Sequence, residues 1–226
     1  MEQMKRYAVY YAPPAGEFWD RASAWLGWDA VRGQAVVPPD LGLDAAAITR
    51  DPGKYGFHGT IKPPFRLADG VDLAALNGAM ADLCARLSPV ELPGLRLKNL
   101  DGFLALVPEG DAAALRALAA AVVEDLDPLR APLTADEIAR RRPERLSLRQ
   151  REQLYRWGYP YVMEEFRFHL TLTDRLAGAQ AAQAATMLEA HFAPVLPRPF
   201  RVADLCLFGE AMDGRFYLLH RYTLSG

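Results

Sequence analysis

The stretch Phe168-His169-Leu170-Thr171-Leu172 repeats, with two changes, an earlier stretch of the same chain, Phe57-His58-Gly59-Thr60-Ile61. Both lie in short runs of apolar and β-prone residues, a pattern that predicts strands. Because successive side chains of a strand point to opposite faces, the His and Thr of each stretch share one face. The apolar residues and the glycine share the other face, so each strand is predicted to turn a His/Thr pair away from the core.

The polar faces of the two strands predict a phosphate site. Imidazole titrates near neutral pH, so one of His58 and His169 can act as a base while the other, protonated, acts as an acid. The hydroxyls of Thr60 and Thr171 can hold the non-bridging oxygens of a phosphoryl group. Two such pairs facing each other suit the metal-free cleavage of a phosphodiester, above all a strained cyclic one.

These motifs resemble those of the 2H phosphoesterase superfamily, which includes the 2′,3′-cyclic phosphodiesterases and the LigT proteins. The run 157–162, WGYPYV, leads into 166–173, FRFHLTLT, and is similar to a bacterial branch associated with phosphonate-utilisation operons. The resemblance implies an α/β (α+β) fold of two pseudo-symmetric lobes, each an antiparallel sheet with outer helices, around a central cleft. It also implies that His58 and His169 are catalytic and that the substrate is a small phosphorylated ribose.

An internal repeat supports two similar lobes. Each half of the chain is predicted to run from a His/Thr strand through a helix to a strand, a turn and a strand. The helices are predicted over 72–87 and 178–192, and the strands after them over 95–100 and 103–107 and over 200–208 and 215–224. Outside the repeat we expect a strand over 6–11 and helices over 17–26, 44–50 and 111–126. The prediction is one 2H phosphoesterase-like domain over 1–226, with lobe 1 at about 1–110 and lobe 2 at about 111–226.

Length and composition are those of a globular protein, with 226 residues of which 51% are hydrophobic and 24% charged. The net charge of −2 creates no overall field that would recruit nucleic acid, so RNA is a less favoured substrate. Cys84 and Cys206 are typical of core thiols rather than of a disulfide framework. No signal sequence or membrane-length apolar run is recognisable, so we expect a cytoplasmic protein without a membrane partner. The oligomeric state stays open.

Residues 130–156 break the symmetry between the halves. They hold eight arginines against four acidic residues. Thr134 followed by Glu137 is typical of a helix N-cap, so an inserted helix or helical pair is predicted here. Two interpretations stay open: a solvated basic helical pair, or an electropositive rim that collects a multiply phosphorylated substrate.

Further residues are candidates for substrate binding. Lys62 and Thr173 continue the polar faces of the two motif strands, and Arg167 precedes the second motif on the same face. Lys62 is followed directly by Pro63, so a solvent-facing lysine is the equal alternative. Tyrosines that could stack on a base or a ribose are Tyr7, Tyr10, Tyr11, Tyr159 and Tyr161, and we include Tyr161 in the site. No Cys, carboxylate or third His repeats with the motifs, so neither a metal nor another cofactor is predicted; zinc on the two histidines is the alternative.

The sequence thus predicts a hydrolase of the cyclic phosphodiesterase type that works by His/His acid–base catalysis. Its pH dependence should be bell-shaped with both limbs near neutrality. Two alternatives stay open, a 2′,3′-cyclic nucleotide or RNA-end phosphodiesterase and a non-catalytic nucleotide- or phosphate-binding module. The sequence does not decide which His is the base, nor whether hydrolysis or ligation is the natural direction.

Overall fold

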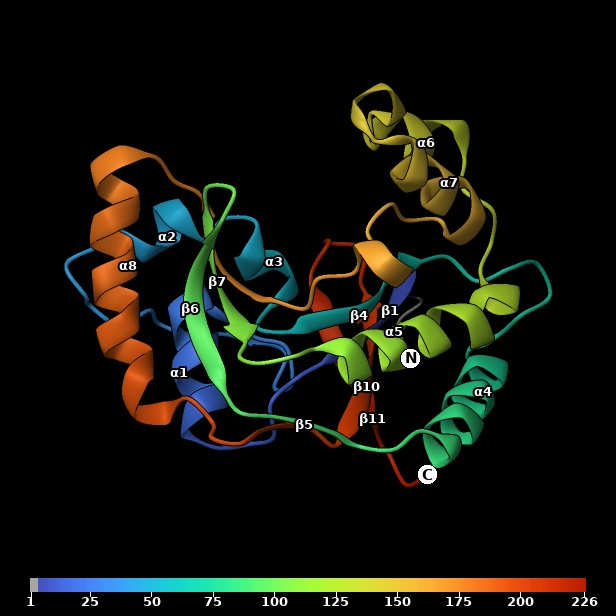
Figure 1. The fold of residues 1–226 in the computed structure, drawn as a ribbon, viewed down its shortest axis with the longest axis horizontal. Coiled ribbons are helices and arrows are strands. Elements are labelled where there is room, and N and C mark those ends of the chain that lie inside the picture. The colour runs from blue at the N-terminus through green and yellow to red at the C-terminus, as the bar shows by residue number, and fades with distance from the viewer. Residues whose placement is uncertain (1–3) are drawn as a thin grey trace.

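A seven-stranded antiparallel sheet forms the centre of the computed structural model, which describes residues 4–226 (Figure 1). Its strands lie in the order β11 (Phe216–Thr223), β10 (Asp204–Glu210), β1 (Arg6–Tyr11), β4 (Gly59–Phe65), β8 (Leu170–Arg175), β7 (Phe103–Pro108) and β6 (Leu95–Leu100). Two short pairs lie outside it, β2 (Trp28–Asp29) with β3 (Gln34–Ala35) and β5 (Val90–Leu92) with β9 (Phe200–Val202). The predicted mixed fold with antiparallel strands is confirmed.

The helices follow the predicted order closely. They are α1 (Glu17–Leu26), α2 (Ala45–Ile48), α3 (Pro52–Tyr55), α4 (Leu73–Arg86), α5 (Ala113–Asp125), α6 (Ala135–Arg140), α7 (Leu148–Trp157) and α8 (Gly178–Phe192). Single 3₁₀ turns are η1 (Asp127–Leu129), η2 (Pro143–Arg145), η3 (Met163–Glu165) and η4 (Ala193–Val195). The bounds of α1 and α8 match the prediction, whereas α3 is an additional helix and the single strand expected over 200–208 is two strands, β9 and β10.

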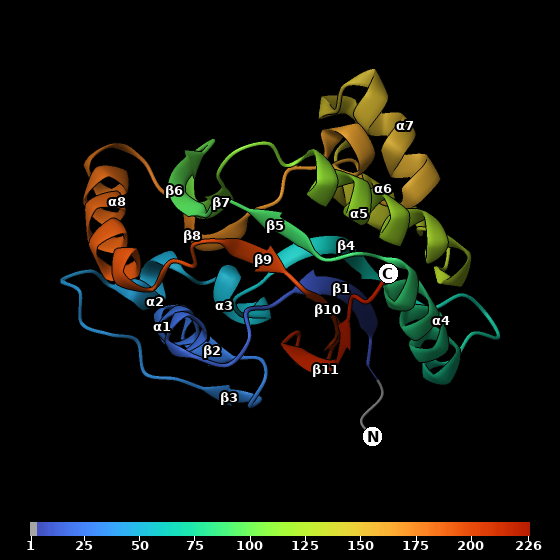
Figure 2. The same ribbon diagram turned by 60° about the horizontal axis from the view of Figure 1, so that its bottom comes forward.

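Each lobe contains strands from both halves of the chain, so the predicted lobe boundaries at about 1–110 and 111–226 are wrong. The motif strand β4 of the first half lies next to β1 and, through it, to the β10–β11 hairpin of the second half. The motif strand β8 of the second half pairs with the β6–β7 hairpin of the first. The segments β5 and β9, which lead to these hairpins, pair with each other where the two halves cross (Figure 2).

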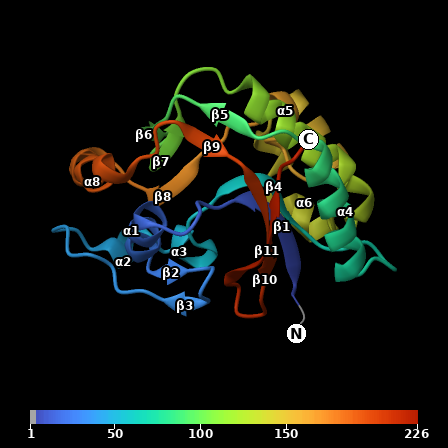
Figure 3. The ribbon, with the colours of Figure 1, turned by 90° about the horizontal axis from the view of Figure 1, so that it is seen from below.

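Because each lobe contains strands from both halves of the chain, the two lobes share one hydrophobic core. Helices α4 and α5 pack on the lobe of β4, and α1 and α8 pack on the lobe of β8, at opposite sides of the molecule in Figure 3. Side chains from both lobes join one hydrophobic cluster, which includes Trp25, Phe192 and Phe208. Burying each such side chain contributes about 1.5–3 kcal/mol. Trp25 also donates from its indole to the carbonyl oxygen of Leu172 at 2.8 Å, which ties α1 to β8.

The arginine-rich segment forms the predicted helical insertion, α6 and α7, which projects at the upper right of Figure 1. Capping boxes begin both helices, with Thr134 and Glu137 at α6 and Ser147 and Gln150 at α7. Each box satisfies two backbone donors that the helix itself cannot pair. None of the helices described in residues 4–226 is long and apolar enough to cross a membrane.

Candidate active site

The two motifs lie side by side because β4 and β8 pair at their first residues. Gly59 and Leu170 are register partners, and each follows its motif histidine directly, so the strands begin two residues later than the predicted stretches, which start at Phe57 and Phe168. In an antiparallel pair the residues flanking such partners also face each other across the strands. This register places His58 and His169 on one face, each opposite the threonine of the other motif.

A close approach between the motifs explains one of their two sequence differences. A Cβ atom added at Gly59 would lie 2.3 Å from the Cζ atom of Phe168, a distance that real Cβ atoms essentially never show. The buried Phe168 ring therefore occupies the space that a side chain at position 59 would need. The counterpart of Gly59, Leu170, is itself buried in the core.

Hydrogen bonds define the tautomer of His58. Its Nδ1 lies 3.1 Å from the carbonyl oxygen of Gly56, and its Nε2 lies 3.2 Å from the hydroxyl of Thr60. Because a carbonyl can only accept, Nδ1 carries the proton and Nε2 is the acceptor of the Thr60 hydroxyl, an assignment made from the hydrogen-bond network. The nitrogen that faces Thr60 is thus the one able to take up a proton.

Aromatic rings enclose the His58 imidazole. Tyr10 stacks on it with ring centroids 3.6 Å apart and planes 18° apart, and Tyr55 meets it edge-on at 5.1 Å. His58 is only 8% exposed. Burial lowers the pKa of His58 to about 3, the nearby His169 adds to the lowering, and the Gly56 hydrogen bond opposes it. His58 is therefore neutral at physiological pH.

His169 is held in the same way but is less enclosed. Its Nδ1 donates to the carbonyl oxygen of Arg167 at 2.8 Å, which repeats the bond from His58 to the residue two positions before it. Phe103 lies beside the ring at a centroid distance of 5.6 Å. Burial lowers the pKa of His169 as well, although this side chain is half-buried rather than buried.

Arg167 and Tyr161 lie near the second motif with exposed side chains. Arg167 contributes its carbonyl oxygen to His169, and its guanidinium is exposed. Tyr161 is 47% exposed and packs edge-on against Tyr159 at 5.7 Å. A substrate contact for either side chain stays a prediction.

Lys62 does not continue the polar face of the first motif, and that prediction is wrong. The register between β1 and β4 shifts between the partners Tyr10 and Thr60 and the partners Val9 and Lys62, which leaves one extra residue in β4. Such a bulge interrupts the alternation of side chains. The Lys62 ammonium is turned toward α5, where it donates to the carbonyl oxygen of Val123 at 3.0 Å.

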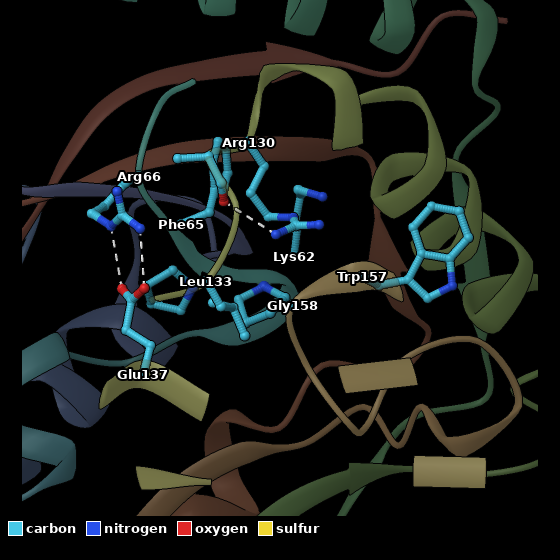
Figure 4. Close-up of a pocket in the computed structure, with 11 residues that line it drawn as sticks. Lys62, Phe65, Arg66, Arg130, Leu133, Glu137, Trp157 and Gly158 are labelled. Atoms are coloured by element: carbon cyan, nitrogen blue, oxygen red, sulfur yellow. Dashed lines mark hydrogen bonds and ion pairs between the residues drawn. The ribbon is translucent and has the colours of Figure 1, made fainter. Parts of the chain in front are cut away.

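Lys62 instead lines a hollow at the base of the insertion (Figure 4). Arg66, Arg130, Glu137 and Trp157 share this lining, and Arg66 pairs with Glu137 there. Burial lowers the pKa of Lys62 to about 8. Neither this hollow nor a second one along α7 is lined by a motif residue, so a cleft over the two histidines stays a prediction.

Thr173 also has a structural partner. Its hydroxyl accepts a hydrogen bond from the backbone N–H of Leu104 at 2.9 Å, and its side chain is buried. The bond lies where the pairing of β7 with β8 shifts register, so the hydroxyl satisfies a donor that the strand ladder leaves free. The predicted role of Thr173 in contacting phosphate is not supported by this geometry.

Two residues that define the site are not recognisable from the sequence in that role. The sequence offers Tyr10 as a candidate for stacking on substrate, not on His58, and it gives no reason to single out Tyr55. The signal for Tyr10 is its place in a strand that pairs with β4, which a single sequence does not reveal. No group of three or more His, Cys, Asp or Glu side chains within residues 4–226 is arranged to hold a metal ion.

The site and the fold define an antiparallel α/β protein in which two His-x-Thr motifs meet at the junction of two lobes. The chain belongs to the family described as "Protein of unknown function (DUF1045)", which matches residues 60–217 and so includes the whole second motif and, from the first, Thr60 and Ile61. The match omits His58, two residues before its start.

Two curated relatives are similar along the chain. One, from Janthinobacterium sp. (strain Marseille), is named "Ribose 1,5-bisphosphate phosphokinase PhnN"; it is 40% identical over 100% of this chain and 52% of that protein. A protein of the same name from Laribacter hongkongensis is 39% identical over 96% of this chain and 51% of that protein. The chain thus spans about half the length of the curated relatives it matches.

Three solved structures are similar to this chain over almost its whole length, at low sequence identity. TT0787 of Thermus thermophilus is 17% identical, with a TM-score of 0.47 over 98% of both chains. E. coli LigT complexed with 3′-AMP is 14% identical, with a TM-score of 0.46 over 99% of this chain and 100% of that chain. A structure described only as a phosphoesterase is 15% identical with a TM-score of 0.46 over 99% of this chain and 100% of that chain.

Proposed function

We propose that this protein is a metal-independent phosphoesterase that hydrolyses a cyclic phosphodiester by His/His acid–base catalysis. The observation that supports the proposal is that the two imidazoles make equivalent hydrogen bonds to the backbone. In each, Nδ1 donates to the carbonyl oxygen two residues earlier, and the pairing of β4 with β8 brings both onto one face. Both Nε2 atoms are thereby available for proton transfer at a shared substrate.

His58 is the proposed base. Its imidazole is neutral over the physiological range because burial lowers its pKa to about 3. The Nε2 atom takes a proton from water as the water oxygen attacks phosphorus in line with the leaving oxygen. Thr60, which donates to this Nε2 in the substrate-free protein, is free to turn its hydroxyl toward a phosphoryl oxygen when water replaces it.

His169 is the proposed acid. A bound phosphate anion favours the protonated imidazole and raises the pKa of this less enclosed histidine. Its Nε2–H gives a proton to the leaving ribose oxygen as the P–O bond breaks, and the product is a phosphomonoester with a free hydroxyl. Thr171 supplies the second hydroxyl beside the phosphoryl oxygens. General acid–base help of this kind contributes ~10²–10⁴-fold per group.

The proposed substrate is a small phosphorylated ribose linked to phosphonate metabolism. Relatives that contain a segment similar to this chain are named for phosphorylation of ribose 1,5-bisphosphate. A cyclic phosphodiesterase supplies such a kinase if it opens a phosphate bridging O1 and O2 of ribose 5-phosphate. Hydrolysis of the O2–P bond then leaves the phosphate on O1, which yields ribose 1,5-bisphosphate.

A turnover screen tests the proposal. Ribose 5-phosphate 1,2-cyclic phosphate and the 2′,3′-cyclic nucleotides are incubated with the protein, and ³¹P NMR follows conversion of the cyclic diester to a monoester. His58→Ala should abolish turnover, whereas His220→Ala, an exposed histidine of β11, should leave it unchanged. No turnover of any cyclic phosphate by the wild-type protein would overturn the proposal and favour a binding module.

Chelation tests the metal alternative. We expect turnover to be unchanged after EDTA, because the two imidazoles and two hydroxyls supply acid, base and oxygen donors without an ion. The rate is compared before and after dialysis against EDTA. A loss that zinc or manganese restores would mean that the histidines are metal ligands.

A second candidate function is hydrolysis of 2′,3′-cyclic nucleotides or of RNA ends. The exposed ring of Tyr161, next to Tyr159, favours it because such rings stack on bases. The same screen separates the two, since this candidate predicts faster turnover of cyclic nucleotides than of the ribosyl cyclic phosphate. Tyr161→Ala should then slow the nucleotides alone.

A further inference from the structure

The arginine-rich insertion is joined directly to the second motif. Helix α7 ends at Trp157, and the loop 158–169 runs from it to His169 (Figure 1). The base of the insertion is held at β4 by the ion pair between Arg66 and Glu137, with the closest atoms 3.1 Å apart (Figure 4). The insertion is thus joined to the loop that leads to His169 and is paired with the residue that directly follows β4.

One arginine of the insertion stacks on an aromatic ring of the loop that leads to the second motif. Arg141 lies over the ring of Tyr159, with its Cζ atom 4.7 Å from the ring centroid. Burial raises the pKa of Tyr10 and of Tyr55, and the nearby Tyr159 hydroxyl adds to both shifts. Tyr10 and Tyr55 are the rings in contact with His58. Tyr159, on which Arg141 stacks, lies in the loop 158–169 that leads from α7 to His169, so Arg141 packs on the segment that carries the proposed acid.

The stacked guanidinium keeps its hydrogen-bond donors free. Stacking uses the flat face of the group, whereas its five N–H donors lie in the plane and point outward. Within residues 4–226 no carboxylate forms an ion pair with Arg141, in contrast to Arg130 with Asp127 and Arg149 with Glu152 and Glu164. The ring orients the cation, and no acid of the described chain neutralises it.

We propose that Arg141, oriented by Tyr159, binds a second, non-reacting phosphate of the substrate. This inference rests on the proposed function and defines the substrate class as a cyclic phosphate that carries a further phosphomonoester. An arginine fork matches the geometry of a phosphate and holds it through charge-assisted hydrogen bonds. The neighbouring Arg140, Arg142 and Arg145 add positive charge around the same turn of the insertion.

The test compares two substrates that differ by one phosphate, ribose 5-phosphate 1,2-cyclic phosphate and ribose 1,2-cyclic phosphate. Arg141→Ala should lower kcat/KM for the first by roughly 10–100-fold, mainly through KM, and leave the second unchanged. Arg141→Lys should recover part of the loss, because it keeps the charge without the fork. Arg156→Ala is the matched control, since Arg156 stacks on Trp157 at 4.6 Å and lines the separate hollow along α7.

A binding measurement keeps the inference separable from the proposed hydrolysis. Both ligands are titrated calorimetrically into the His58→Ala/His169→Ala variant, with and without Arg141→Ala. A preference for the doubly phosphorylated ligand that is lost with Arg141 supports the site even where the wild-type protein hydrolyses neither ligand, and that outcome would refute the proposed function alone. Equal effects of Arg141→Ala on both ligands, or no effect on either, would overturn the inference.

Discussion

In both His-x-Thr motifs the histidine bonds the backbone carbonyl two residues earlier, but the surroundings of the two imidazoles differ. His58 has Tyr10 stacked on it and Tyr55 edge-on, and it bonds Thr60 through Nε2, whereas His169 is half-buried and lies beside the tilted ring of Phe103. The two histidines and threonines are the same in both motifs, so the difference between the imidazoles comes from the side chains that surround them. The fuller enclosure of His58 favours its neutral form, which is the basis for assigning His58 as the proposed base and His169 as the proposed acid.

The largest expected effect comes from removing either imidazole. His58→Ala and His169→Ala should each lower kcat/KM by at least about 10²-fold, because each removes a proton-transfer group from the same transition state. The loss of kcat/KM in the double variant should be much smaller than the product of the two single losses. Steady-state kinetics on the best cyclic phosphate measures all three.

Turnover that does not require one of the histidines would contradict the proposed roles of the two imidazoles. Undiminished turnover in His169→Ala would mean that only the enclosed motif is catalytic and that the duplication is structural. Independent, fully multiplicative losses would mean that the two imidazoles do not act on one phosphate.

The next effect concerns the contact between the motifs. Gly59→Ala should destabilise the fold by about 1–3 kcal/mol, because the new methyl group overlaps the buried Phe168 ring. Urea unfolding measures the change, and Gly78→Ala in α4, where nothing lies within 4 Å, serves as control. Adding Phe168→Leu to Gly59→Ala should restore part of the loss. A Gly59→Ala variant as stable as the wild type would mean that the motifs do not pack as described.

The sequence predicts those parts of the fold that depend on local patterns. Alternation identifies the buried faces of both motifs, and helical spacing gives α1 and α8 within their observed bounds. The main elements of each half also follow the predicted order, although the short strand β5 is missed and β9 and β10 are predicted as one strand. All of these follow from the period of apolar residues along one segment.

Features that depend on pairing between distant segments are not predictable in this way. The exchange of hairpins between lobes requires knowing that β5 pairs with β9, and neither segment has a pattern that names its partner. The bulge that turns Lys62 toward α5 arises in the register of β4 against β1. The stacking of Tyr10 on His58 depends on the same pairing, which explains why the sequence does not reveal the aromatic enclosure.

A third prediction uses the lowered pKa of His58 as a measure of its enclosure. In the unfolded chain this imidazole takes up a proton near pH 6.5, whereas in the folded protein burial lowers its pKa to about 3. The folded state is therefore increasingly penalised as pH falls from 6.5 toward 3, by about 2 kcal/mol at pH 5. His58→Gln should remove this part of the acid sensitivity in urea titrations at pH 7.5 and 5.

His169 provides the comparison for this dependence of the folding stability on pH. Its imidazole is half-buried, so His169→Gln should change the difference in stability between the two pH values less than His58→Gln does. Equal changes for the two variants would mean that the motifs are equally enclosed in solution. His220→Gln on the exposed edge of β11 controls for the loss of a histidine as such.

The smallest expected effect concerns the ring that stacks on His58. The acid limb of kcat/KM reports the base of the free enzyme, so it should lie well below pH 6.5 rather than near neutrality. Tyr10→Leu removes the stacked ring and lets water approach, which weakens the desolvation that lowers the pKa of His58. The limb should then move upward by roughly one pH unit or less, the equivalent of ~1.4 kcal/mol. Tyr10→Phe keeps the ring and should leave the limb in place. A limb that moves with Tyr10→Phe as much as with Tyr10→Leu would assign the effect to the phenol hydroxyl instead of to the enclosure.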